Sequence, residues 1–143
     1  MNIDEKKEWL DRYRRLVRKC ENLNAQINIA RQLELPGGLK LSDMPKGTTQ
    51  KDLSDYAAKF DRLLTDLERA KNQRRRVFFE ITEVVNRLDG TEAQILTYKY
   101  LDLLEWEDVF DRTGYSQSRC YELHRLALEN LEIKNSVVNR SES

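Results

Sequence analysis

Histidine, cysteine, proline and glycine are all scarce in this chain of 143 residues, which has one His, two Cys, two Pro and five Gly. His124 is the only histidine, so the sequence offers no set of histidine and cysteine ligands that could complete a zinc site, and it offers no Ser-His-Asp arrangement. No glycine-rich loop that could cradle a phosphate is present either. We therefore expect no metal, no cofactor, no small-molecule substrate and no enzymatic activity.

The few cysteines and the lack of long apolar runs restrict the setting of the protein. Cys20 and Cys120 both occupy apolar positions of helical patterns, which favours reduced core thiols over a disulfide or a redox role. The N-terminal residues 1–16 are charged throughout, and no segment approaches the roughly 20 apolar residues of a membrane helix. A secretory signal is also absent, so we expect a cytoplasmic protein that does not contact membranes.

Charge is abundant but balanced, because Lys plus Arg and Asp plus Glu each number 25. A chain that is 39% hydrophobic and 35% charged, with little glycine or proline, favours long helices over sheets, and we predict an all-α fold. Because the formal net charge is zero, the overall charge gives no indication of a nucleic-acid partner. The distribution of charge along the chain must therefore decide that question.

Two long stretches carry apolar or small residues at alternating steps of three and four, the spacing of a coiled coil. The first predicts a helix over about residues 4–33, with Trp9, Tyr13, Leu16, Cys20, Leu23, Ile27 and Ala30 along its seam. The second predicts a helix over about residues 50–88, roughly 58 Å long at 1.5 Å per residue. Its seam holds Leu53, Tyr56, Phe60, Leu63, Leu67, Ala70, Arg74, Val77, Ile81, Val84 and Leu88. Thr49 and Asp52 resemble a capping pair at the start of this second helix, and Gly90 predicts its end.

Residues 34–49 carry both prolines and three of the five glycines, which predicts a connector between the two helices. It is either a flexible turn or a binding loop. If the helices fold back on each other so that Leu33 meets Gln50, residue i faces roughly residue 83 minus i. Trp9 would then stack on Arg74 in a cation-π contact. Pairing between two chains, which would give a homodimer, is the alternative.

Shorter helices are predicted after this hairpin. Thr91–Gln94 matches a capping box and predicts a helix to about residue 103. A short helix over about residues 106–113 and a longer one over about 116–133 follow. The polar residues 135–143 are predicted to form a flexible tail.

The sequence thus predicts a long helical hairpin over residues 1–90 and a three-helix module over residues 91–134. Within that module, the last two helices have the features of a helix-turn-helix. Gly114 suits a turn that needs a positive φ, and Ser116 stands where a helix N-cap is wanted.

The last helix has two distinct faces. Its buried stripe is predicted to be Cys120, Leu123, Ala127 and Leu131. The opposite face would project Gln117, Ser118, Tyr121, Glu122 and Arg125 towards a major groove. Gln can pair with adenine, Glu can accept from cytosine, and Arg119 could reach either backbone or base. An ordinary exposed polar face is the alternative.

The segment ILTYKYLDLLEWEDVFDRTGYSQSRCYELHRLALENL, residues 95–131, resembles region four of bacterial sigma factors, which contacts the upstream promoter hexamer. The shared pattern is a first helix with tyrosine, an acidic helix, a glycine-apolar-serine turn and a recognition helix. Most of the chain is also similar to small Firmicute phage proteins grouped with late-gene transcriptional regulators of the ArpU/RinA type. The resemblance implies base contacts from Gln117, Ser118, Arg119, Tyr121 and Glu122, and a backbone contact from Arg125.

Charge is unevenly distributed between the two predicted parts. Residues 91–134 hold five Lys or Arg and nine Asp or Glu, a net of −4, and the other residues sum to +4. Because basic groups supply most non-specific DNA affinity, we expect the hairpin to supply the DNA backbone contacts. The candidates are Arg12, Arg14, Arg15, Arg18, Lys71, Arg75 and Arg76.

These observations predict a transcriptional regulator that binds a promoter-like site on double-stranded DNA. Its coiled coil would serve dimerisation or contact with RNA polymerase, and a sigma-like promoter-melting region is not visible. The alternative is a non-enzymatic coiled-coil adaptor or assembly protein whose C-terminal helices bind protein rather than DNA.

Overall fold

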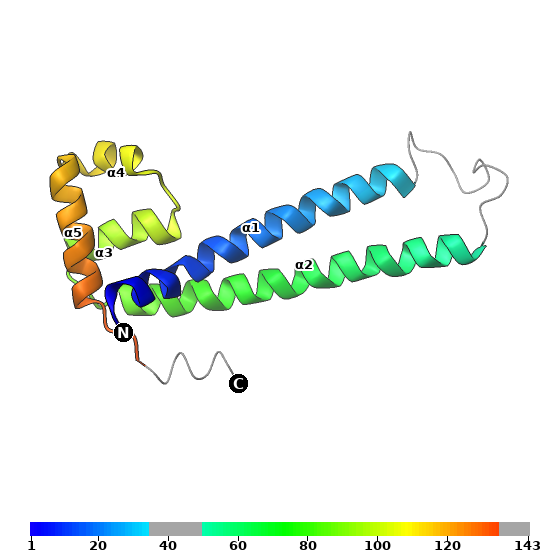
Figure 1. The fold of residues 1–143 in the computed structure, drawn as a ribbon, viewed down its shortest axis with the longest axis horizontal. Helices are drawn as coiled ribbons and strands as arrows, with labels where there is room; N and C mark the ends of the chain where they lie inside the picture. Colours follow the sequence, from blue (N-terminus) through cyan, green and yellow to red (C-terminus); the bar gives the residue numbers. More distant parts are fainter. Residues whose placement is uncertain (35–49, 135–143) are drawn as a thin grey trace. The chain divides into compact units, whose positions relative to one another are not determined.

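The computed structural model describes residues 1–34 and 50–134, and the fold is all-α (Figure 1). The two long helices are α1 (Ile3–Glu34) and α2 (Gln50–Val85). They are followed by α3 (Gly90–Leu96), the π-helix η3 (Thr97–Leu101), α4 (Trp106–Thr113) and α5 (Gln117–Asn130). No β-strand occurs in the described ranges, and no helix there is long and apolar enough to cross a membrane.

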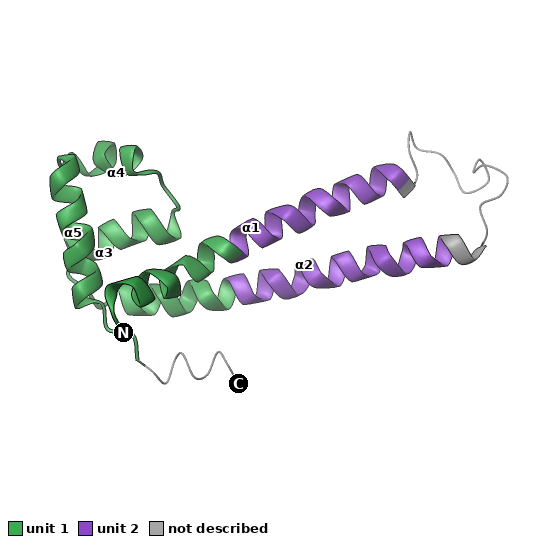
Figure 2. Cartoon of the chain, in the orientation of Figure 1, with its two compact units in different colours: residues 1–15, 75–143 green, residues 16–74 purple. Residues whose placement is uncertain are grey.

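The chain divides into two compact units (Figure 2). Unit 1 comprises residues 1–15 and 75–143, and unit 2 comprises residues 16–74. The sequence pattern placed a boundary at residue 90, but the units divide inside both long helices. The start of α1 and the end of α2 belong with the C-terminal helices, because they bury apolar side chains in the same unit.

Unit 2 is a pair of helices with a narrow core. Its buried side chains are Cys20, Leu23 and Ile27 of α1 with Leu67 and Ala70 of α2, and Phe60, Leu63 and Leu64 pack partly buried against them. These are seam residues with the exception of Leu64, so the coiled-coil spacing identified this core correctly. Tyr56 is 55% exposed although the pattern assigned it to the seam.

The register of the antiparallel pair differs from the predicted one. Arg31 lies over the Phe60 ring at 5.6 Å in unit 2, and within unit 1 Arg12 pairs with Glu80 and Tyr13 packs on Phe78. The paired residue numbers therefore sum to 91 or 92 rather than 83. The predicted pairing of Leu33 with Gln50 was wrong. At the connector side, α2 extends roughly two turns beyond the end of α1.

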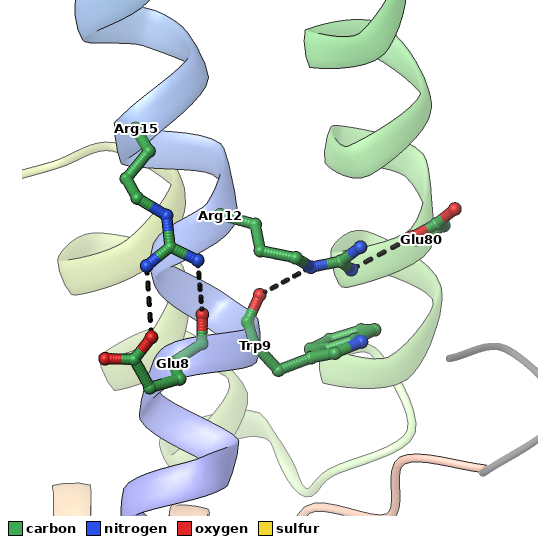
Figure 3. Close-up of polar contacts among 5 residues, drawn as sticks. All are labelled: Glu8, Trp9, Arg12, Arg15 and Glu80. Carbon is green, nitrogen blue, oxygen red and sulfur yellow. Dashed lines mark hydrogen bonds and ion pairs between the residues drawn. The ribbon is translucent and has the colours of Figure 1, made fainter. Parts of the chain in front are cut away.

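In unit 1 the ends of the two long helices also contribute buried side chains. Trp9, Leu10, Val77, Ile81, Val84 and Val85 are all buried. The Arg12 guanidinium lies 4.6 Å from the Trp9 ring centroid, so Trp9 receives its cation from its own helix and the predicted contact with Arg74 was wrong (Figure 3). A neighbour one turn away on the same helix needs no long-range register to reach the ring.

The junction between α2 and α3 also differs in detail. Helix α2 ends at Val85 and not near residue 88, and the turn that follows is closed by hydrogen bonds such as Leu88 N to Val85 O at 3.0 Å. Asp89 is the N-cap of α3, and its carboxylate accepts from the Glu92 amide at 3.1 Å. The predicted capping box was therefore shifted, since the cap is Asp89 rather than Thr91. Thr49, most of the connector and the tail lie outside the described residues.

Candidate nucleic-acid interface

The first helix of the C-terminal module changes its winding before it ends. Helix α3 passes into the π-helix η3, where the Asp102 amide donates to Thr97 O at 2.8 Å. Leu103 then adopts a φ of 57°, which costs a leucine about 1–2 kcal/mol. The loop is held by Lys99 Nζ, which donates to Leu104 O at 2.8 Å. The sequence predicted continuous helix here, because the hydrophobic period does not reveal a π-turn.

The turn between α4 and α5 has the predicted chemistry. Gly114 ends α4 with a φ of 73°, and its amide donates to Phe110 O at 2.9 Å. Thr113 Oγ1 donates to Val109 O at 2.8 Å and accepts from the Tyr115 amide at 3.2 Å. Ser116 caps α5, with its hydroxyl accepting from the Arg119 amide at 3.2 Å. The structure thus confirms the positive φ of Gly114 and the capping role of Ser116.

The buried side of α5 is the predicted stripe. Cys120, Leu123, Ala127 and Leu131 are all buried, and the first two share a cluster with Ile95 of α3 and Val109 of α4. Both cysteines of the chain are free and buried, in agreement with reduced core thiols. This cluster joins three helices, so the orientation of α5 depends on α3 as well as on α4.

Trp106, the first residue of α4, is the centre of an aromatic cluster that sequence reasoning did not identify. Its ring makes edge contacts with Tyr121 and His124, with ring centroids 4.9 Å and 5.1 Å away. Phe110 stacks on the same ring at a centroid distance of 6.1 Å. Lys99 Nζ lies 4.8 Å from the Trp106 centroid. The helical spacing of Trp106 with Phe110 and of Tyr121 with His124 was the available signal. This spacing places two aromatic side chains on one face of α4 and two on one face of α5, but it does not show that the two faces contact each other.

His124 is a half-buried residue that packs within this aromatic cluster. It stacks on Tyr100 at 5.7 Å, and its Nε2 is 2.9 Å from Tyr100 Oη. Burial, with smaller contributions from Lys7 and Lys99, lowers the pKa of His124 to about 4, so the ring is neutral near pH 7. Burial likewise raises the pKa of Tyr100 and lowers that of Lys99. Packing therefore favours the neutral form of each of these three groups.

The outward side of α5 brings the predicted base-contact residues together. Gln117, Ser118, Arg119, Tyr121, Glu122 and Arg125 are all exposed. Two pairs form within this face: Gln117 Nε2 donates to Tyr121 Oη at 3.2 Å, and Arg119 pairs with Glu122 at 3.3 Å. Arg125 lies 3.8 Å from Glu129, one turn further on. A contiguous polar surface therefore starts at the capped end of the helix.

The C-terminal end of α5 is fastened to other elements of unit 1. Lys6 Nζ of α1 donates to Leu128 O at 2.8 Å and Glu129 O at 3.2 Å. A cation there also complements the negative end of the helix dipole. Asn130 Nδ2 donates to Oε1 of the buried Glu92 at 2.9 Å. The first turns of α1 are thus part of the scaffold that holds α5.

Three of the arginines predicted to contact DNA phosphates are engaged inside unit 1. Arg12 pairs with Glu80 at 2.9 Å and donates to Trp9 O, and both charged side chains are only 21% exposed. Arg15 pairs with Glu8 at 3.1 Å and donates to Glu8 O (Figure 3). Arg14 donates to Lys99 O at 3.3 Å. Arg12 and Arg14 therefore stabilise the fold, which the run of basic letters could not show.

The other basic candidates lie elsewhere on the two long helices. Arg75 and Arg76 are exposed on the part of α2 that belongs to unit 1. Arg18 is exposed and Lys71 is half-buried, both in unit 2. For these four residues a contact with DNA stays a prediction.

Comparisons of the chain with protein-family models, with curated proteins and with solved structures found no match. Within the described part of the chain, no group of three or more His, Cys, Asp or Glu side chains could hold a metal ion. The candidate interface is therefore defined by its own geometry: a capped, exposed polar helix face that packs on an aromatic and aliphatic core.

Proposed function

We propose that the chain is a DNA-binding transcriptional regulator of the phage late-gene type, in which α4 and α5 act as a helix-turn-helix. The observation that supports this best is the first two turns of α5. The Ser116 cap and the Gly114 turn leave Gln117, Ser118 and Glu122 exposed there. A recognition helix contacts base edges from its N-terminal residues, which is where this surface lies.

The attraction to phosphate would come from the long helices. The module of residues 91–134 has a net charge of −4, which opposes non-specific binding to DNA. With Arg12 and Arg14 engaged internally, the exposed Arg18 and Arg76 are the better candidates for backbone contacts. A homodimer would bring two sets of these groups to one site, with half-sites about 34–36 Å apart or a multiple of that.

RNA polymerase is the second proposed partner. Glu105, Glu107, Asp108 and Asp111 are exposed along α4, next to the proposed recognition helix but on a different element. A DNA-binding surface does not need carboxylates there, and a contact with a basic surface of polymerase would use them. In this arrangement the chain would recruit polymerase rather than replace a sigma factor.

The engaged arginines also favour a second candidate function, a non-enzymatic adaptor or assembly protein. If Arg12, Arg14 and Arg15 only stabilise unit 1, the chain presents less positive charge than its sequence suggests. The polar face of α5 and the acidic face of α4 would then bind protein.

A gel-shift titration of the intact chain with fragments of its source genome, with and without RNA polymerase, separates these two functions. We expect selected fragments to bind well above the background, either alone or with polymerase. A Ser118→Glu variant, which adds a carboxylate at an exposed position, should abolish the selection without altering the circular-dichroism spectrum. If no fragment is selected at low salt in either condition, the adaptor is the better account.

A salt titration of the double variant Arg18→Gln/Arg76→Gln tests the source of the phosphate attraction. Affinity should fall for every sequence alike, and the slope of log K against log salt should become shallower by about 1 to 2. Arg15→Gln is the matched control, because Arg15 is also exposed but is paired with Glu8. Unchanged slopes in the double variant would exclude Arg18 and Arg76 as phosphate contacts.

A further inference from the structure

Gln117 and Tyr121 form a hydrogen-bonded pair at the start of α5 that is supported from below. The Tyr121 ring makes edge contacts with Trp106 at 4.9 Å and Phe110 at 5.7 Å, so both α4 aromatics fix its position. Its hydroxyl accepts from Gln117 Nε2 at 3.2 Å, yet the side chain is still 42% exposed. The neighbouring pair, Arg119 with Glu122, has no such support and is about half exposed at both ends.

The hydrogen bond leaves the Gln117 amide with a defined set of groups. A glutamine amide has two N–H donors and one carbonyl acceptor, and one of these donors is given to Tyr121. One donor and the acceptor remain. Adenine presents a matching acceptor at N7 and donor at N6 in the major groove, whereas guanine presents two acceptors at N7 and O6. A free amide can turn its NH₂ group towards both guanine acceptors, but an amide held by Tyr121 cannot.

We infer that Tyr121 is a positioning residue that holds the Gln117 amide for adenine and against guanine at one base pair of the target site. The inference rests on the proposed function, because it names the base that the α5 surface would select. Its physical basis is preorganisation: an amide already oriented in the free protein loses less freedom on binding and is costly to turn away from its partner. Gln117 touches the base, and Tyr121 acts through it.

The test is a selection of bound sequences from a random DNA library by the intact chain, followed by affinity measurements at each selected position. Gln117→Ala should lower the preference for adenine at one position by about 5- to 150-fold. Tyr121→Phe keeps the ring on Trp106 and removes only the hydroxyl. It should lower the preference for adenine over guanine at the same position by about 2- to 12-fold, with an unchanged melting temperature.

Tyr115→Phe is the matched control, because Tyr115 is also 42% exposed, stands beside the same turn, and makes no hydroxyl hydrogen bond in the described ranges. It should leave every base preference unchanged. If the wild-type chain selects a motif but Tyr121→Phe behaves like Tyr115→Phe, the positioning role is overturned while DNA binding stands. If the wild-type chain selects no motif, the proposed function fails and the inference with it.

Discussion

The two compact units use the same pair of long helices to different ends. In unit 2, α1 and α2 bury little more than one narrow seam between them. In unit 1, the ends of the same helices form a core that includes Leu10, Ile81 and Val85, and Lys6 fastens the far end of α5. Of the fully buried large side chains in the described residues, only Cys20 lies in unit 2. The difference teaches that each long helix serves two cores: one end stabilises the unit that holds the C-terminal helices, and the other end forms a thin seam within unit 2.

The largest expected effect compares one leucine from each unit. Leu10→Ala removes a fully buried side chain from unit 1 and should lower the free energy of unfolding by about 3–5 kcal/mol. Leu23→Ala in the thin seam of unit 2 should cost about 2–3 kcal/mol, since its surroundings can collapse more easily. Urea unfolding followed by circular dichroism measures both variants, because both units are helical. Equal costs for the two variants would contradict the difference between the cores.

Acid should weaken unit 1 through its histidine, the only one in the chain. The pKa of His124 is about 4 in the folded protein, so between pH 6.5 and 4 the unfolded chain binds a proton that the folded chain does not. Stability is therefore full above about pH 6.5 and falls by about 1–3 kcal/mol as the pH drops to about 4. Urea unfolding at several pH values measures this slope. His124→Gln should flatten it, and parallel slopes for the two proteins would show that His124 is not responsible.

Arginines of the two units should respond differently to the same substitution. Arg12→Gln breaks the half-buried pair with Glu80 in unit 1 and should cost about 1–3 kcal/mol. Arg18→Gln, at an exposed position of unit 2, should change stability by less than about 0.5 kcal/mol. Thermal unfolding of the two variants is sufficient for the comparison. A stability loss in Arg18→Gln as large as that in Arg12→Gln would mean that Arg18 is also a structural residue.

The smallest effect concerns the recognition turn itself. Ser116→Ala removes the cap of α5 and should cost about 1 kcal/mol. Ser118→Ala, two residues later and exposed, should cost almost nothing. Thermal unfolding of this serine pair tests whether the turn contributes to the stability of unit 1. If both substitutions are neutral, the capping bond does not stabilise α5.

Much of this architecture was predictable because its causes are local. The coiled-coil spacing identified the two long helices, and Gly114 and Ser116 identified the turn, since a positive φ and an N-cap each favour few residue types. The buried stripe of α5 followed from its period of 3.6. These features depend on neighbours within a few residues.

The misses depended on contacts between distant residues. The helix register could not be derived without knowing how far α2 extends beyond α1, and the partners of Arg12 and Arg14 lie on α2 and η3. The π-turn and the left-handed Leu103 arise where Lys99 and the packed loop hold the backbone. The contacts of Trp106 with Tyr121 and His124 depend on how α4 packs against α5, which the sequence alone does not show.

Amide hydrogen exchange of the intact chain, with and without a selected DNA fragment, tests the central claim most directly. If α5 is a recognition helix and the exposed arginines hold the phosphates, DNA should slow exchange at the start of α5, residues 117–122, and around Arg18 and Arg76. Exchange in the buried half of α5 should change little. Protection confined to the hairpin, with no change in residues 117–122, would contradict the assignment of α5 as the DNA-recognition element.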